Sequence, residues 1–150
     1  MSDDGVLVEV DSLVANEFTV EIEGETLLGV FRVGGLVSFK LDGADENHAQ
    51  VVHPPFTLAK MVQRDGNNIF NKWLRETVSA APGADRPRRT VAIVAVDDGV
   101  ETRRWTAEGA WITEVRYSEF DTGSSDMVEE IITVHYDSLT ETWPATPNME

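Results

Sequence analysis

The chain has 150 residues, enough for one domain with its own core, and 41% of them are hydrophobic. Its 27 acidic and 12 basic residues give a formal net charge of −15, which opposes binding to nucleic-acid phosphates and anionic lipid. The absence of cysteine excludes disulfides, thiolate metal sites and cysteine nucleophiles. The acidic start, Met1–Asp4, does not resemble a secretory signal, and no apolar run approaches the ~20 residues that cross a bilayer. We therefore expect assembly in the cytoplasm, no membrane insertion by the protein itself and no direct specific nucleic-acid binding.

Strand patterns dominate the first third of the chain. Residues 1–16 alternate only weakly and are interpreted as an N-terminal arm. In Phe18–Glu23, apolar and polar side chains alternate, which predicts a half-buried strand. Residues 27–39 are mostly apolar, but Gly29 and Gly34-Gly35 interrupt them. Glycines inside a strand are typical of bulges and bends, so we expect a curved sheet or barrel.

A polar loop and two short strand segments come next. Leu41–His48 is rich in turn-forming residues. It does not fit a calcium loop of the EF-hand type, which requires a glutamate where this chain has His53. Gln50–His53 and Phe56–Val62 are strand-like and are separated by Pro54-Pro55, which confines that break to an edge or a bulge.

One stretch has the periodicity of an amphipathic helix. Asp65 or Asn67 is the expected N-cap, and proline and glycine within residues 80–83 end the pattern. The apolar side chains recur at spacings of three and four residues and are expected to pack against a sheet rather than to bind a cofactor. They are Ile69, Phe70, Trp73, Leu74 and Val78.

The last third returns to strands. Thr90–Val96 is rich in β-branched residues, and Asp97-Asp98-Gly99 after it is a strong hairpin signal. Gly109–Tyr117 and Met127–Tyr136 read as two further strands joined by a polar loop. Residues 140–150 are polar and contain prolines, and we expect them to form a mobile tail.

The order of strands, one helix and more strands predicts a mainly β fold of the α+β class. We expect an antiparallel β-barrel or sandwich with one flanking α-helix. No internal repeat divides the sequence, so residues 1–150 are predicted to form a single domain.

The sequence does not favour catalysis. The carboxylate pairs Asp97-Asp98 and Glu129-Glu130 are neighbours on strands, so their side chains point to opposite faces and do not converge. The three histidines lie in no metal-binding spacing, and neither a nucleophile elbow nor a phosphate loop occurs. We predict no enzyme, no catalytic residue, no cofactor and no metal site. A monomeric small β-barrel that binds a ligand is the alternative from another class.

A series of motifs occurs in a fixed order along the chain. The most informative part is an aromatic strand, a Ser-containing loop and a Glu-Ile strand within Trp105–Tyr136. The earlier motifs are Phe18-x-Val20-x-Ile22-x-Gly24, Gly29-x-Phe31-x-Val33-Gly34-Gly35-Leu36, Phe56–Lys60, Ile69–Trp73 and Val91–Gly99. In this order the motifs resemble the tail tube proteins of contractile phages and of phage-tail-like injection systems, and the resemblance extends from about Phe18 to Leu139.

This resemblance implies a structural protein whose protomers form stacked hexameric rings around a lumen. It implies sheath and baseplate proteins as partners, a cargo protein in the lumen, and a final place in a phage virion or a released injection particle. A tube-initiating baseplate subunit of the same family is the alternative. By the same analogy, the loop between Val37 and Val51 contacts the adjacent ring. The candidate residues for this contact are Asp42, Gly43, Asp45, Glu46 and Asn47.

Open strand edges suggest how such a ring closes, since pairing between neighbours removes edges that otherwise promote aggregation. We expect the sheet to contain the strands in Phe18–Glu23, Val30–Lys40, Gln50–Lys60 and Val128–Tyr136, with apolar faces on the helix and acidic faces toward the lumen. The alternative, that the acidic residues simply face bulk water, remains open. The candidate lumen-facing acids are Glu21, Glu23, Glu129 and Glu130.

Overall fold

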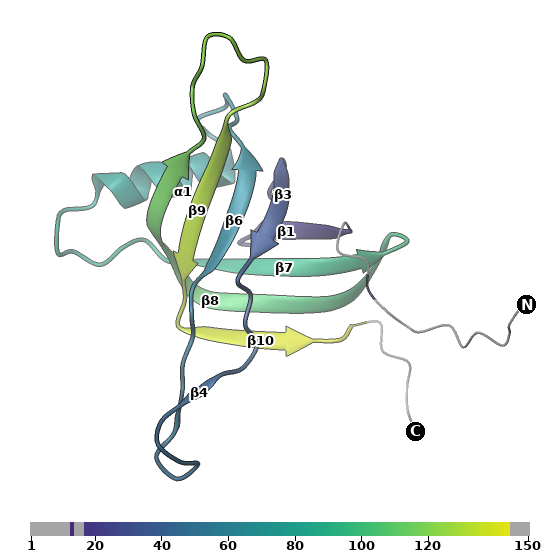
Figure 1. Ribbon diagram of the computed structural model, residues 1–150, viewed down its shortest axis with the longest axis vertical. Coiled ribbons are helices and arrows are strands. Elements are labelled where there is room, and N and C mark those ends of the chain that lie inside the picture. Colours follow the sequence, from purple (N-terminus) through teal and green to yellow (C-terminus); the bar gives the residue numbers. More distant parts are fainter. Residues whose placement is uncertain (1–12, 14–16, 145–150) are drawn as a thin grey trace, which may run out of the picture.

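The computed structural model describes residue 13 and residues 17–144 and contains two antiparallel sheet layers that share one long, bent strand (Figure 1). The expected N-terminal arm lies, apart from Leu13, outside the described residues, as do residues 145–150 of the expected tail. In Figure 1 the strands of one layer run vertically and those of the other run horizontally. The fold is therefore a sandwich with one flanking helix, as predicted, and does not close into a barrel.

The long strand β8 (Val100–Tyr117) belongs to both layers. Its first half pairs with β7 and β10, and its second half pairs with β9. The first layer also contains β1 (Phe18–Ile22), β2 (Glu25–Thr26), β7 (Arg89–Asp97) and β10 (Ser138–Thr142). The second layer also contains β3 (Val30–Gly34), β6 (Phe56–Met61) and β9 (Glu129–His135). A separate ribbon consists of β4 (Leu41–Asp42) and β5 (Gln50–Val51).

This arrangement corrects several expectations about the strands. β1 belongs to the same eight-stranded sheet as β3, β6 and β9, as expected, but it pairs with β7, and the bend in β8 places it in the other layer. The strand expected over residues 30–40 ends at Gly34, where Gly35 follows with a φ of 73°. The two segments separated by Pro54-Pro55 are β5 and β6, as predicted, but only β6 joins the sheet, because β5 pairs with β4 in the ribbon. Residues 140–142 are paired in β10 and are not part of a tail.

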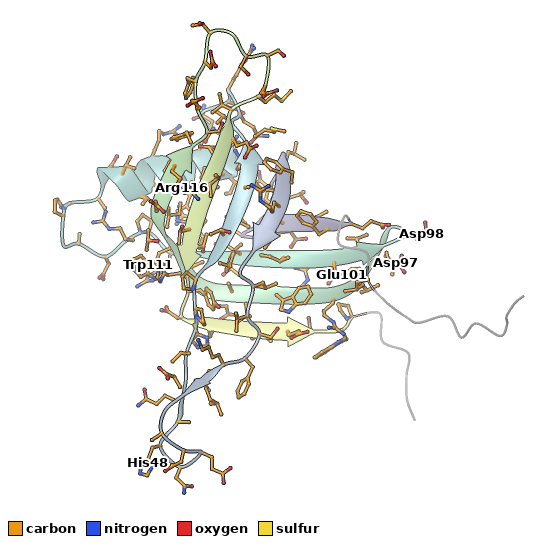
Figure 2. The ribbon with its side chains drawn as sticks, in the orientation of Figure 1. His48, Asp97, Asp98, Glu101, Trp111 and Arg116 are labelled. Carbon is orange, nitrogen blue, oxygen red and sulfur yellow. The ribbon has the colours of Figure 1, made fainter. Side chains whose placement is uncertain are left out.

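The hairpin prediction at Asp97-Asp98-Gly99 is confirmed. Asp97 pairs with Val100, and the two residues between them have positive φ angles, 52° at Asp98 and 81° at Gly99. Positive φ at both central residues is the conformation of the tight turn that matches strand twist. The turn joins β7 to β8 at the far end of the first layer, where Figure 2 labels Asp97 and Asp98.

A glycine bulge marks the bend in β8. Between the pairs Arg89–Ala110 and Val91–Ala107, two residues of β8, Glu108 and Gly109, lie opposite one residue of β7. Gly109 has a φ of 67°, and a Cβ placed there would lie 2.1 Å from an Asp137 carboxylate oxygen. The bulge therefore depends on glycine, which adopts this conformation without a steric penalty.

We expect Gly109→Ala to lower the free energy of unfolding by more than the about 1–2 kcal/mol that a left-handed conformation costs a residue with a Cβ, because the added Cβ also meets the Asp137 side chain. Urea denaturation measures this loss. Gly83→Ala is the matched control for the clash, since Gly83 has a φ of 81° but a Cβ there meets nothing within 4 Å. A loss at residue 109 no greater than that at residue 83 would show that the Asp137 contact adds nothing.

The helix α1 (Ile69–Ser79) covers the inner face of the second layer. Phe70 and Trp73 are fully buried in the core, and Ile69 and Leu74 pack against it at its margin. Val78, expected on the same face, is 70% exposed. Thr77 takes its place, because positions 70, 73 and 77 follow the helical repeat more closely.

The N-cap of the helix is neither of the two expected residues but Asn68, one residue after Asn67. The Asn68 side chain accepts a hydrogen bond from the Asn71 backbone N–H at 2.7 Å, and this contact makes Asn68 the N-cap. Asp65 instead accepts a bond from the Asn67 N–H at 2.9 Å in the turn that precedes the helix. The helix ends at Ser79 with Ala80 as its C-cap, close to where the proline and glycine that follow predicted its end.

Candidate functional site

The second layer ends in two strand edges that lack a partner among the described residues. β3 pairs only with β6, and residues 111–117 of β8 pair only with β9. Unpaired edges present free backbone N–H and C=O groups and favour pairing with another chain. These two edges lie on opposite sides of one layer (Figure 1).

One face of this layer is not covered by the helix. The cross-strand pairs Leu58–Ile132 and Lys60–Glu130 point into the core, so the alternate pairs Thr57–Thr133 and Ala59–Ile131 point away from it. We call this outward side the open face. Its charged side chains are Arg32, Glu114, Arg116 and Glu129.

The charges on the open face are balanced. Arg32 and Glu129 form an exposed ion pair at 3.7 Å, and Glu114 and Arg116 add one charge of each sign. The open face therefore lacks the excess of acidic side chains expected from the sequence.

The four candidate acidic residues lie in different environments. Glu129 is on the open face, and its neighbour Glu130 points to the other side of β9 and is 2% exposed, so the prediction that Glu130 is an exposed charge is wrong. Glu21 lies in the first layer, where it binds Arg104. Glu23 is in the turn after β1, with a φ of 52°, and its carboxylate accepts a bond from the Thr90 N–H.

Lys60 and Glu130 form a buried ion pair between the second layer and the helix. The Lys60 ammonium donates to a Glu130 oxygen at 2.8 Å and to the Met61 carbonyl at 2.8 Å, and it lies 5.0 Å from the centre of the Phe70 ring. The Tyr117 hydroxyl donates to the other Glu130 oxygen at 3.3 Å. Burial, and then the negative charge of Glu130, raise the pKa of Tyr117 above its usual value. The pair thus connects three strands and α1.

The alternation of side chains along the two strands could have predicted this pair. Leu58 and Ile132 stand two residues from Lys60 and Glu130, so alternation places all four side chains on the same inner face. A lysine and a glutamate on inner faces must pair to offset the cost of burial.

A second charge network lies on the outer side of the first layer. Arg104 donates to Glu101 at 2.8 Å from two nitrogens and to Glu21 at 2.8 and 3.3 Å. Hydrogen bonding from Arg104 holds the pKa of Glu101 below its usual value, and hydrogen bonds to both carboxylates raise the pKa of Arg104. All three side chains remain partly exposed.

We expect Glu101→Gln to cost about 0.5 kcal/mol of stability at pH 7, since partly exposed ion pairs contribute little. The folded-state pKa of Glu101 is depressed, so its contribution is present above the unfolded value, 4.5, and is lost as pH falls through the folded value. The difference between the parent and Glu101→Gln should therefore disappear well below pH 4.5. Urea denaturation at pH 7 and in acid tests this, and a difference that persists in acid would contradict it.

The ribbon of β4 and β5 projects away from both layers (Figures 1 and 2). It contains all five residues proposed for the contact between rings, and His48 lies at its tip. The Asp45 carboxylate holds the tip by accepting bonds from the Asn47 N–H at 3.0 Å and from His48 Nδ1 at 2.8 Å. Gly43 is required here, because a Cβ would lie 2.6 Å from the Ala49 Cα. Four exposed side chains sit near its base and along it: Phe39, Lys40, Leu41 and Val51.

The part of the chain that the structure describes contains no cluster suited to a metal ion. Over residues 17–144, no group of three or more acidic or histidine side chains is arranged to hold a metal ion. Among the same residues, no helix is long and apolar enough to cross a membrane.

The fold is shared with solved components of contractile injection systems. The chain is similar to the anti-feeding prophage tube-terminating cap, with a TM-score of 0.72, 19% identity, and 95% of this chain and 98% of that one covered. It is similar to a chain of the PVC sheath-tube complex in the extended state, with a TM-score of 0.68 and 19% identity. That comparison covers 89% of this chain and 93% of the other. It is also similar to Hcp1 from Flavobacterium johnsoniae, with a TM-score of 0.54 and 10% identity, and the comparison covers 85% of this chain and 95% of Hcp1. At these identities the likeness establishes the fold.

A search of curated protein sequences gave no match. A family model does match: the one described as T4-like virus tail tube protein gp19 covers residues 14–140. This is a family of structural tube proteins and not of enzymes. Because the match spans most of the 150 residues, this chain belongs to the T4-like virus tail tube protein gp19 family.

Proposed function

We propose that this protein is the inner tube protomer of a contractile phage tail or a phage-tail-like injection system. Copies close side by side into sixfold rings around a hollow axis, and the rings stack into a tube. The observation that carries this proposal is the pair of free edges on one layer, β3 on one side and residues 111–117 of β8 on the other. A chain with two different free edges forms a closed ring when each edge pairs with the other edge of the next copy.

In this ring the open face of the second layer lines the lumen. Edge pairing joins the layers of neighbouring copies into one continuous sheet, and the helix side of that sheet is already covered. Glu129 and Arg32 then face the lumen, while Glu21 and Glu23 in the first layer do not. A cargo protein in the lumen would then meet a wall that carries both charge signs.

The projecting ribbon is proposed to contact the adjacent ring. Its tip residues, Asp42 to Asn47, extend beyond the two layers, and Phe39 and Leu41 near its base are 67% and 48% exposed. Exposed apolar side chains of this size favour burial against a partner. Sheath and baseplate proteins are the expected partners of the assembled tube, which forms in the cytoplasm and ends in a virion or a released particle.

Sedimentation and negative-stain imaging of the purified protein over a salt series test this proposal. Copies that each carry −15 repel one another, and salt screens this repulsion over roughly 8 Å at physiological ionic strength. We expect rings and stacked tubes to form more readily as salt rises. Single rings that never stack would indicate a tube-initiating baseplate subunit. A stable monomer under all conditions would contradict the proposal and favour a monomeric binding module.

A further inference from the structure

An apolar groove opens between the two layers on the side of β3. It has a volume of about 470 Å³, and its lining includes Phe18, Phe31, Val33 and Trp105. On the opposite side of the molecule lies α1 (Figure 1), whose Phe70 and Trp73 are buried in the core. The sandwich is therefore closed by its own helix at one side and open at the other.

The end of this groove carries uncompensated negative charge. Glu17 lines the groove, and its carboxylate accepts a bond from the Asp98 N–H at 3.1 Å, so it lies beside the β7–β8 turn. Glu17, Asp97 and Asp98 are exposed, and none has an ion-pair partner among the described residues. We call these three residues the acidic rim.

The helix side of the molecule has the opposite charge. Residues 64–89 hold six of the chain's 12 lysines and arginines and only three of its 27 acidic residues, so their net charge is +3 while the remainder carries −18. Figure 1 places α1 and its following loop on one side of the molecule, and Figure 2 places Asp97 and Asp98 on the other.

The exposed face of α1 combines positive charge with one large apolar side chain. Lys72, Arg75 and Val78 follow one another at intervals of three, so they lie along one side of the helix. Neither Lys72 nor Arg75 has a carboxylate partner among residues 17–144, and Val78 is 70% exposed.

We propose that α1 of one copy docks against the groove and acidic rim of the next copy in the ring. The inference rests on the proposed ring and names a second contact between neighbours, in addition to the paired edges. Val78 enters the apolar groove, and Lys72 and Arg75 approach the acidic rim. The occupant is another copy of this chain, because the two complementary surfaces lie on opposite sides of the same molecule, as a head-to-tail ring requires. A long polyanion is disfavoured by the −18 that surrounds the basic surface.

Charge reversal tests this contact. Asp97→Lys alters the rim without changing the positive-φ residues of the turn, and Lys72→Glu alters the helix near its N-terminus, where a glutamate is tolerated. Each single change is expected to raise the concentration needed for ring formation, measured by native mass spectrometry, by at least about tenfold. The chain that carries both changes regains complementary surfaces and should recover most of this loss.

Two control variants separate local contact from net charge. Glu119→Lys and Arg64→Glu change the net charge by the same amounts but lie in the β8–β9 loop and in the loop between β6 and α1, outside the proposed contact. Each control should change the concentration needed for ring formation only through its net charge, and neither should show the tenfold increase expected of the reversals. A thermal unfolding midpoint close to that of the parent confirms that each variant is folded.

The outcomes distinguish this inference from the proposed function. If the parent forms rings and the reversals behave like their controls, the docking contact is wrong and the proposed ring stands. If the parent forms no ring at any salt concentration, both proposals fall.

Discussion

Replacing Lys60 with methionine is expected to lower the free energy of unfolding by about 3–5 kcal/mol, because the change leaves a buried carboxylate without its partner. Lys60 is 0% exposed and Glu130 is 2% exposed, and the two are joined by a 2.8 Å hydrogen bond. The methionine fills a similar volume, so the loss reports on charge and not on packing. Urea denaturation at pH 7 measures it.

Two further variants isolate the cause. Lys60→Met combined with Glu130→Leu removes both charges and should recover most of the lost stability, since apolar pairs of similar volume replace buried ion pairs without penalty. Arg32→Met is the exposed control: its pair with Glu129 is 59% and 38% exposed, and its loss should stay below about 1 kcal/mol. A single Lys60 variant as stable as Arg32→Met would show that the buried pair does not hold the second layer to the helix.

Trp73→Ala is expected to lower the free energy of unfolding by about 3–5 kcal/mol through loss of the largest buried side chain of the core. Trp73 is 0% exposed, and its indole N–H donates to the Pro87 carbonyl at 3.0 Å, which fixes the loop after the helix. Trp73→Phe keeps most of the volume but removes the donor, so an intermediate loss of about 1–2 kcal/mol is expected. Thermal and urea unfolding give both values.

Trp143→Ala is the matched control, because Trp143 is 50% exposed and contacts mainly the Arg103 guanidinium, 5.1 Å from the ring centre. Its expected loss is about 0.5 kcal/mol. Equal losses at residues 73 and 143 would contradict the assignment of α1 as part of the core.

The fold class and the helix were predictable because both depend on local patterns. Apolar side chains at a spacing of two residues predicted β1, β6 and β9, and those at spacings of three and four predicted α1. The turn at Asp97-Asp98-Gly99 was predictable because its residues are types that adopt a positive φ. The division of the sheet was not predictable in this way. It depends on the bulge at Gly109, whose role is visible only when the pairing of β7 with β8 is known.

The candidate site was less predictable than the fold. The sequence marks Glu129 and Glu130 as equally acidic, and their opposite environments follow from the register that sets Lys60 across from Glu130. Val78 fits the helical pattern within one residue, but Thr77 continues the buried face set by Phe70 and Trp73, and Val78 is exposed. The opposite charges of the helix side and the acidic rim depend on residues far apart in the chain, so only their arrangement in space relates them.

Backbone hydrogen exchange of isolated rings and of single chains tests the edge pairing of β3 with β8 most directly. In the ring, the edge amides of Val30–Gly34 and of residues 111–117 should exchange more slowly than in the single chain, because pairing between copies protects them. The polar loop at residues 121–126 should exchange equally in both forms. Unchanged exchange at both edges in rings would contradict closure by strand pairing.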